Sequence, residues 1–195
     1  MIRSENAPGW YSRRIVAKFA DMKKKNAPVL PDLLAPGLDV VFCGTAPGAV
    51  SAQRKQYYAH PQNKFWRALH DAGLTPRLLQ PSEYETLLTY RIGLTDIAKH
   101  VSGMDSQLPR GSLGKDAIAD LRARIGKYKP RILAFTSLTG GRKLAGSGAD
   151  FGRQSITIGQ TEVWILPSPS PAAHWNWQKN EKVWRALAQE VRKPR

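Results

Sequence analysis

Short apolar runs along the chain predict strands, and the runs at 40–43 and 131–135 are typical of strands buried on both faces. The segment at 91–97 is also strand-like. Two alternating, β-branched segments around Gly159-Gln160 indicate a hairpin. The predicted strands cover residues 40–43, 91–97, 131–135, 154–158 and 161–166.

Apolar residues that recur every three or four positions predict helices between and around these strands. The predicted helices cover residues 11–22, 63–72, 82–90, 115–128 and 178–191. Asn63 is the expected N-cap of the helix at 63–72, and Gly73 its stop. Ser82 and Glu85 have the spacing of a capping box at the start of the helix at 82–90.

The alternation of strands and helices predicts an α/β fold: a single-domain three-layer α/β/α sandwich with a mainly parallel central sheet. A chain of 195 residues suits one domain with a proper core. We expect residues 1–26 to form a basic N-terminal arm and residues 27–195 to form the α/β domain. The arm either follows nucleic-acid phosphates or is a solvated tail.

Charge narrows the choice of partner. Thirty lysines and arginines against fifteen acidic residues give a net charge of +15, so a polyanion is expected. Nucleic acid is favoured over an anionic membrane, because no segment sets a long apolar face against its basic residues. No apolar run approaches the ~18 residues of a membrane span, and the first residues lack the apolar region of a secretory signal. We expect a cytoplasmic monomer, held at the nucleoid through DNA.

The sequence offers no pattern for a metal or a cofactor. Cys43 is the only cysteine, which excludes a disulfide framework and a four-cysteine iron–sulfur cluster. The four histidines lack the spacing of metal ligands, so we expect no metal. Glycines between residues 137 and 150 match neither a phosphate-binding loop nor a dinucleotide fingerprint, and we expect no cofactor.

Residues 38–66 hold the strongest functional signal. The predicted strand at 40–43 runs into Gly44-Thr45-Ala46-Pro47-Gly48, a tight turn at the carboxyl end of the strand, where open α/β sheets bind ligands. A basic and aromatic segment follows, with Arg54, Lys55, Tyr57 and Tyr58. Flat rings beside backbone amides could hold a planar heterocycle. An ordinary strand-turn-helix with surface tyrosines is the structural alternative.

This stretch resembles the first motif of the uracil-DNA glycosylase superfamily, most closely that of the mismatch-specific uracil/thymine-DNA glycosylase branch. The branch reads APGL-VVFCGINPG and, after a spacer, AHPxNxFW. The chain has APGL at 35–38, VVFCGTAPG at 40–48 and YAHPQNKFW at 58–66. It departs from the branch at Ala46, where the branch has asparagine. Residues 93–95 resemble a pocket-lining Gly-Leu-Thr element of the same branch.

A second motif resembles the superfamily in the proline-rich segment LPSPSPAAH at 166–174. The branch has LPNPSGLxR there, and its leucine is a wedge that helps to hold the base stack open. Ala172 stands at the leucine's place, and three fewer carbons weaken such a plug by roughly 2 kcal/mol. Trp175 or Trp177 could take over by stacking. Ser168 stands where the classical branch has histidine; a proline-rich surface loop is the structural alternative.

The resemblance implies an enzyme that flips uracil out of DNA and hydrolyses its N-glycosidic bond, which leaves an abasic site. Tyr58 would stack on the base, and backbone amides of Thr45 and Tyr58 would meet its carbonyl oxygens. The residues expected to bind the base are Gly44, Thr45, Ala46, Ser51, Tyr58, Asn63 and Ser168. The residues expected to bind DNA are Ser170, Ala172, Ala173, His174 and Trp175.

The catalytic group must be sought outside position 46, where the branch has asparagine and this chain has alanine. An oxocarbenium-like sugar needs a nearby negative charge or a held water, and Ala46 can supply neither. Thr45 could hold a water through its hydroxyl but cannot act as a base. Asp96 is the first candidate acid, although it could instead cap the turn that follows it. His174 is the second candidate and Asp105 the third.

Two functions are consistent with these residues. The first is a monofunctional uracil-DNA glycosylase with a relocated catalytic group, acting on single- or double-stranded DNA. The second is a binding module of the same fold that recognises damaged, extruded or abasic nucleotides with little or no cleavage. Ala46 and Ala172 favour the module, whereas Tyr58, the turn amides and Asp96 favour the enzyme.

Overall fold

The computed structural model describes residues 27–173 and 176–194. Its sheet has five strands in the order β2-β1-β3-β5-β4. The strands are β1 (Val40–Gly44), β2 (Ile92–Asp96), β3 (Ile132–Phe135), β4 (Gly152–Ile158) and β5 (Thr161–Ile165). All neighbouring strands run parallel except β4, which pairs antiparallel with β5 at the edge. The predicted, mainly parallel α/β sheet is therefore confirmed.

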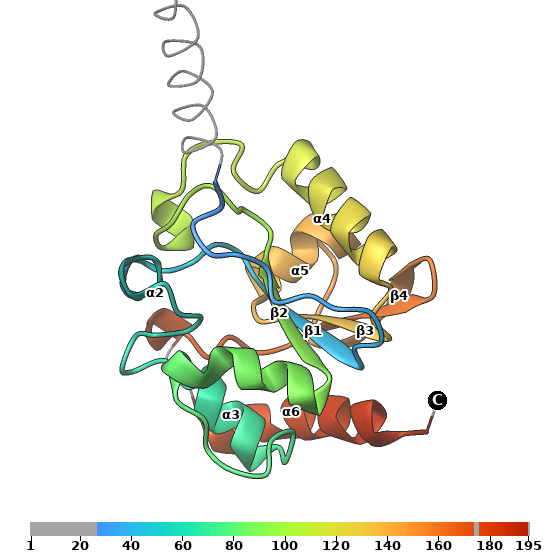
Figure 1. Cartoon of the computed structure of the whole chain (residues 1–195). Helices are drawn as coiled ribbons and strands as arrows, with labels where there is room; N and C mark the ends of the chain where they lie inside the picture. The colour runs from blue at the N-terminus through green and yellow to red at the C-terminus, as the bar shows by residue number, and fades with distance from the viewer. Residues whose placement is uncertain (1–26, 174–175, 195) are drawn as a thin grey trace, which may run out of the picture.

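Helices cover both faces of the sheet (Figure 1). α3 (Phe65–Asp71), α6 (Trp177–Arg192) and the 3₁₀ helix η1 (Pro81–Tyr90) lie over one face. α4 (Lys115–Tyr128) and α5 (Leu138–Ala145) lie over the other. Three short helices occupy the connections: α2 (Ala49–Arg54), η2 (Asp105–Gln107) and η3 (Pro171–Ala173). The result is the predicted three-layer α/β/α sandwich.

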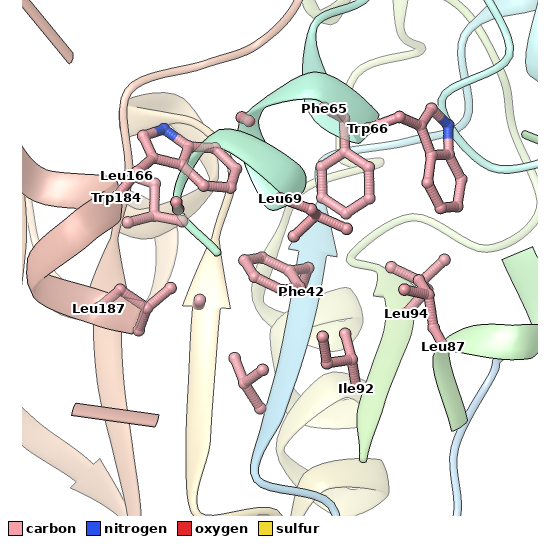
Figure 2. Close-up of a cluster of buried hydrophobic side chains, with 14 of the residues drawn as sticks. Phe42, Phe65, Trp66, Leu69, Leu87, Ile92, Leu94, Leu166, Trp184 and Leu187 are labelled. Atoms are coloured by element: carbon pink, nitrogen blue, oxygen red, sulfur yellow. The ribbon is translucent and has the colours of Figure 1, made fainter. Parts of the chain in front are cut away.

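The alternation of side chains along β1 creates two cores. Phe42 belongs to the core under α3 and α6, whereas its neighbour Cys43 belongs to the core under α4 and α5. Figure 2 shows Phe42 at the centre of the first core. Its ring stacks on Trp184 at 5.8 Å between centroids and meets Phe65 edge-on at 5.4 Å. These aromatic contacts fix α3 and α6 against the middle of the sheet.

Two helix starts differ from the prediction. Lys64, not Asn63, is the N-cap residue of α3, although Asn63 Oδ1 still accepts a hydrogen bond from the Phe65 amide. The segment at 82–90 is a 3₁₀ helix that begins one residue earlier. Its capping box joins Gln80 and Glu83, because Glu83 reaches back to the Gln80 amide at 2.8 Å.

The sequence pattern missed α2 and α5. In α5 a glycine is required at 141 by packing, since a Cβ there would lie 2.4 Å from the buried Ile165 side chain. Ser137 caps this helix by accepting a hydrogen bond from the Gly140 amide. Gly141 thus lets α5 approach β5 closely, a use of glycine that a local pattern cannot separate from a turn.

Some predictions fall outside the described residues: the basic arm at 1–26, the helix predicted at 11–22, and the site candidates His174 and Trp175. The link at 27–37 is described, and its buried Leu30 and Leu33 anchor it to the core. In the part of the chain that the structure describes, no helix has the length and apolar character that crossing a membrane requires.

Two glycines inside helices give a matched test of the packing. A Cβ at Gly126 of α4 meets nothing within 4 Å, so Gly126→Ala should raise the free energy of unfolding by about 0.5–1 kcal/mol. Gly141→Ala should lower it by about 1–3 kcal/mol, because the new methyl group overpacks the core against Ile165. Urea unfolding of both variants measures the difference. Equal stabilisation by both would show that α5 does not need the glycine.

Candidate functional site

A cavity of about 900 Å³ opens at the carboxyl edge of the parallel strands. The turn after β1 (residues 44–48, here the strand-end turn) forms one wall, and the proline loop (residues 166–173) contributes another from Pro167 to Ala173. Segments 103–107 and 136–139, Asp96 and residues between 49 and 63 also line the cavity. Topology explains the convergence, because parallel strands end at the same edge of the sheet.

Every described residue that the sequence singled out as base-binding or DNA-binding lines this one cavity. They are Gly44, Thr45, Ala46, Ser51, Tyr58, Asn63, Ser168, Ser170, Ala172 and Ala173. The acid candidates Asp96 and Asp105 line it too. Residues from the two resembled motifs, more than 100 positions apart, therefore meet at one place.

Asp96 lies at the base of the strand-end turn. It is the last residue of β2 and is paired in register with Gly44, the last residue of β1. A Cβ at Gly44 would lie 2.6 Å from Asp96 Oδ1, so only glycine leaves room for the carboxylate. Asp96 is 3 % exposed, and its Oδ2 has no hydrogen-bond partner among the described residues. A buried carboxylate with one unbonded oxygen thus belongs to the lining of the cavity.

Burial raises the pKa of Asp96 from 3.8 to about 6. The positive charge of Lys99 opposes this rise, and Asp32 adds to it. Lys99 Nζ lies 3.8 Å from Asp96 Oδ2, beyond hydrogen-bonding distance but close enough for a strong ionic interaction. The carboxylate is therefore ionised in neutral solution and takes up a proton near pH 6.

A buried network of charges supports Asp96 from behind. Lys99 is 7 % exposed, and its Nζ lies 2.7 Å from Asp32 Oδ1 and 3.2 Å from the Tyr57 hydroxyl. Asp32 also contacts Arg124 of α4 at 3.3 Å and accepts a hydrogen bond from Thr95 at 2.7 Å. The Arg124 guanidinium in turn donates to the Asp96 carbonyl at 3.1 Å.

Sequence reasoning missed Asp32, Lys99 and Arg124. Asp32 stands in a proline-punctuated link, and Arg124 is one basic residue among several on an amphipathic helix. Lys99 follows Asp96 by three residues, the only local signal for any of these contacts. Asp32 and Arg124 are 92 residues apart, so their contact is a property of the fold.

The ring of Tyr58 is only partly available to a base. It stacks on Phe65 at 3.8 Å between centroids, so a base could stack only on the opposite face. Its hydroxyl is hydrogen-bonded to Thr136 Oγ1 at 3.2 Å. Burial, and then the charge of Asp96, raises the pKa of the phenol, which keeps it neutral. The backbone of Tyr58 has a φ of 52°, in the left-handed region. The surrounding contacts therefore hold this residue in a strained conformation.

The side chains of Thr45, Ser51 and Asn63 are already engaged. The Thr45 hydroxyl donates to Asp105 Oδ1 at 2.5 Å, which competes with the predicted role of holding a water. Ser51 Oγ accepts from the Ala59 amide at 3.0 Å, and Asn63 Oδ1 accepts from the Phe65 amide at 2.9 Å. Ser51 and Asn63 therefore shape the pocket by fixing the segment that carries Tyr58.

The proline loop is anchored at two points. The Lys64 amide donates to the Pro169 carbonyl at 2.9 Å, and the Trp184 indole donates to the Pro167 carbonyl at 3.3 Å. Within the loop, Ser168 Oγ accepts from the Ser170 amide at 3.2 Å. Ala172 and Ala173 are exposed at its end. The loop is thus held against α3 and α6 while its tip faces solvent.

The described residues contain no group of three or more His, Cys, Asp or Glu that could hold a metal ion. Cys43 is buried inside β1, and burial raises the pKa of its thiol well above the usual value. It is a packing residue, not a nucleophile. The lining of the cavity includes a buried carboxylate, Asp96, and a neutral tyrosine, Tyr58.

The raised pKa of Asp96 can be tested with Asp96→Asn through the pH dependence of the free energy of unfolding. Between the ordinary value of 3.8 and the folded value of about 6, the folded protein binds more protons, so Asp96 makes stability fall as pH rises. Asparagine carries no charge and removes that contribution. The free energy of unfolding of the variant minus that of the parent should therefore rise by about 2–3 kcal/mol when the pH is raised from about 3.5 to about 7.5. Urea unfolding at both pH values measures it; parallel stability curves would contradict a raised pKa.

Comparison with known proteins identifies the fold and the family of the chain. The chain matches the solution NMR structure of a "putative Uracil DNA glycosylase" from Methanosarcina acetivorans, with a TM-score of 0.58 and 24% sequence identity. The match covers 84% of this chain and 97% of that chain, and it shows that the two share a fold. The family model of the Uracil DNA glycosylase superfamily matches residues 31–192, which include the strand-end turn, Asp96 and the proline loop. The chain therefore belongs to the uracil DNA glycosylase superfamily.

Proposed function

We propose that this protein is a DNA glycosylase that flips uracil out of DNA and hydrolyses its N-glycosidic bond, with Asp96 as the catalytic carboxylate. Membership of the superfamily supports DNA as the partner and glycosylase chemistry as the activity. The observation that carries the assignment is the buried Asp96 carboxylate, which lines the cavity and has one oxygen without a hydrogen-bond partner among the described residues.

The proposed mechanism follows from where charge develops. As the glycosidic bond lengthens, the sugar becomes positive and the departing base becomes negative. Ionised Asp96 would stabilise the sugar and orient the attacking water, and its raised pKa suits it to accept a proton from that water. Backbone amides of Thr45 and Tyr58 would meet the oxygens of the base and lower the barrier electrostatically. Ala46 supplies only a methyl group.

We assign the chain to the mismatch-specific uracil/thymine branch on the sequences of the strand-end turn and of residues 58–66. On this assignment, Tyr58 stacks on the uracil through the face of its ring that Phe65 leaves uncovered. Ser170, Ala172 and Ala173 would meet the DNA at the exposed tip of the proline loop, and His174 and Trp175, which follow in the sequence, are proposed to bind DNA as well.

The binding module without efficient cleavage is the second candidate. It is favoured by one observation: the strand-end turn carries no free side-chain group for water, since Ala46 has none and the Thr45 hydroxyl is held by Asp105. Incubation with uracil-containing oligonucleotides, single- and double-stranded, followed by alkali, separates the two. Strand breaks at uracil support the enzyme, and tight binding to abasic DNA without breaks supports the module.

Asp96→Asn is the central kinetic test. The change keeps the shape of the side chain but removes its charge, so the single-turnover rate of uracil excision should fall by about 10²–10³. Affinity for duplex DNA should hold. Asp105→Asn is the matched control, an acid in the same cavity that is exposed at the mouth, and it should cost less than about tenfold because it does not reach the buried base of the cavity.

Enzyme excess separates the chemical step from product release in this comparison. The assignment of Asp96 is wrong if Asp96→Asn cleaves at the parental rate. Loss of activity in His174→Ala, with Asp96→Asn active, would assign the chemistry to His174.

Lys99 should set the pH at which the enzyme loses activity in acid. The parental single-turnover rate should fall as pH decreases through about 6, because Asp96 then gains a proton. Lys99→Met removes the cation that lowers the pKa of Asp96, so this acidic limb should move to higher pH. Lys99→Arg keeps the charge and should restore the parental position. Rates measured between pH 5 and 9 test this, and an unmoved limb in Lys99→Met would argue against Asp96 as the titrating group.

A further inference from the structure

Exposed apolar side chains gather at the mouth of the cavity. Among the described residues, the large hydrophobic side chains that are exposed are Leu78, Leu88, Met104 and Phe151. Met104 is 55 % exposed and Phe151 is 45 % exposed, and both line the cavity. Leu78 and Leu88 do not line it. Exposure of two large apolar groups costs solvation free energy, so their place at the site indicates a binding role.

Phe151 is held beside the proline loop by the sheet. β4 is antiparallel, so it begins at the carboxyl edge of the parallel strands, and its first residue, Gly152, pairs with Ile165 at the end of β5. Phe151 therefore precedes β4 where the proline loop leaves β5. The Gln154 side chain donates to the carbonyls of Asp150 and Gly152, at 2.7 and 2.9 Å. These bonds fix the backbone on both sides of Phe151 while its ring stays in solvent.

Met104 is held beside the strand-end turn in a similar way. The residue before it, Gly103, donates its amide to the Pro47 carbonyl at 2.9 Å. The residue after it, Asp105, accepts the hydrogen bond from Thr45 at 2.5 Å. Both neighbours of Met104 are therefore tied to the turn. Phe151 and Met104 thus stand beside the two different segments that wall the cavity.

The DNA that enters this site needs such side chains. Extruding a nucleotide leaves apolar base faces unstacked, and proteins commonly fill the gap with an apolar wedge or stack an aromatic ring on the exposed base. Ala172, at the tip of the proline loop, has only a methyl group for this purpose. Phe151 and Met104 offer the larger apolar groups that a wedge requires.

We propose that Phe151 and Met104 pack against the bases that flank the extruded nucleotide and hold the opened duplex stack. This inference rests on the proposed function, because it concerns DNA bound at the same cavity. The two side chains act on the stack and not on the glycosidic bond. Their contribution should therefore depend on whether the substrate is a duplex.

The test compares Phe151→Ala and Met104→Ala with Leu78→Ala and Leu88→Ala, which remove exposed apolar groups away from the cavity. Phe151→Ala should lower the single-turnover rate on duplex uracil DNA by about tenfold, as expected for one lost base–aromatic contact. Met104→Ala should lower it by about threefold, because a thioether chain presents less contact area. On single-stranded uracil DNA each should change the rate less than about twofold, since no stack is opened.

A second readout does not depend on cleavage. Duplexes with 2-aminopurine beside a tetrahydrofuran abasic analogue report unstacking through fluorescence, and the same titration gives the affinity. Phe151→Ala should bind these duplexes more weakly and give a smaller signal, whereas Phe151→Trp should keep both. If the parent binds and unstacks this DNA without ever cleaving uracil, the proposed function fails while this inference stands.

Three results would overturn the inference. The first is equal loss of rate on single and double strands in Phe151→Ala, which would place the ring in the base pocket. The second is loss no greater than in the Leu78 and Leu88 variants. The third is unchanged affinity and fluorescence of Phe151→Ala with the abasic duplex. That result would show that the exposed side chains do not contact DNA and would point to a different partner.

Discussion

The close approach of Gly44 and the Asp96 carboxylate is the constraint on which the site depends. Two parallel strands end side by side, and the missing Cβ of Gly44 leaves the space that Asp96 Oδ1 fills, 2.6 Å from where a Cβ would be. A carboxylate in that position is desolvated, which raises its pKa to about 6, and one of its oxygens has no donor among the described residues. The glycine thus fixes both the place and the reactivity of the acid.

Burying that charge requires the charges behind it. Lys99 and Arg124 bring two cations against the two carboxylates of Asp96 and Asp32, so the network is close to neutral. Asp32 comes from the link before β1, which is fastened by the Leu33–Leu94 bridge and by the bond from the Val29 amide to the Lys99 carbonyl. The link is therefore part of the site, and loss of its anchoring would disturb the charge state of Asp96.

The cavity and the rest of the molecule differ in charge. The chain carries +15, yet none of the described residues that line the cavity is lysine or arginine, and its charged members are Asp96 and Asp105. This division suits a protein that attracts a polyanion over its surface but receives a neutral base inside. In the proposed mechanism, the acidic interior would stabilise the positive charge that develops on the sugar, which a basic lining would oppose.

Local pattern determined the strands, the long helices and the edge of the sheet where the ligand site lies, because periodicity and turn residues act over a few positions. The resemblance brought Asp96 forward, since the residue follows the Gly-Leu-Thr element at 93–95 that resembles a pocket-lining segment of the branch. The tertiary structure decided what that carboxylate is: buried, opposed by Gly44 and balanced by Asp32, Lys99 and Arg124. It also decided that Gly141 belongs to a helix and that Thr45 binds Asp105. Each of these depends on a distance between segments far apart in the chain, and sequence periodicity carries no information about such distances.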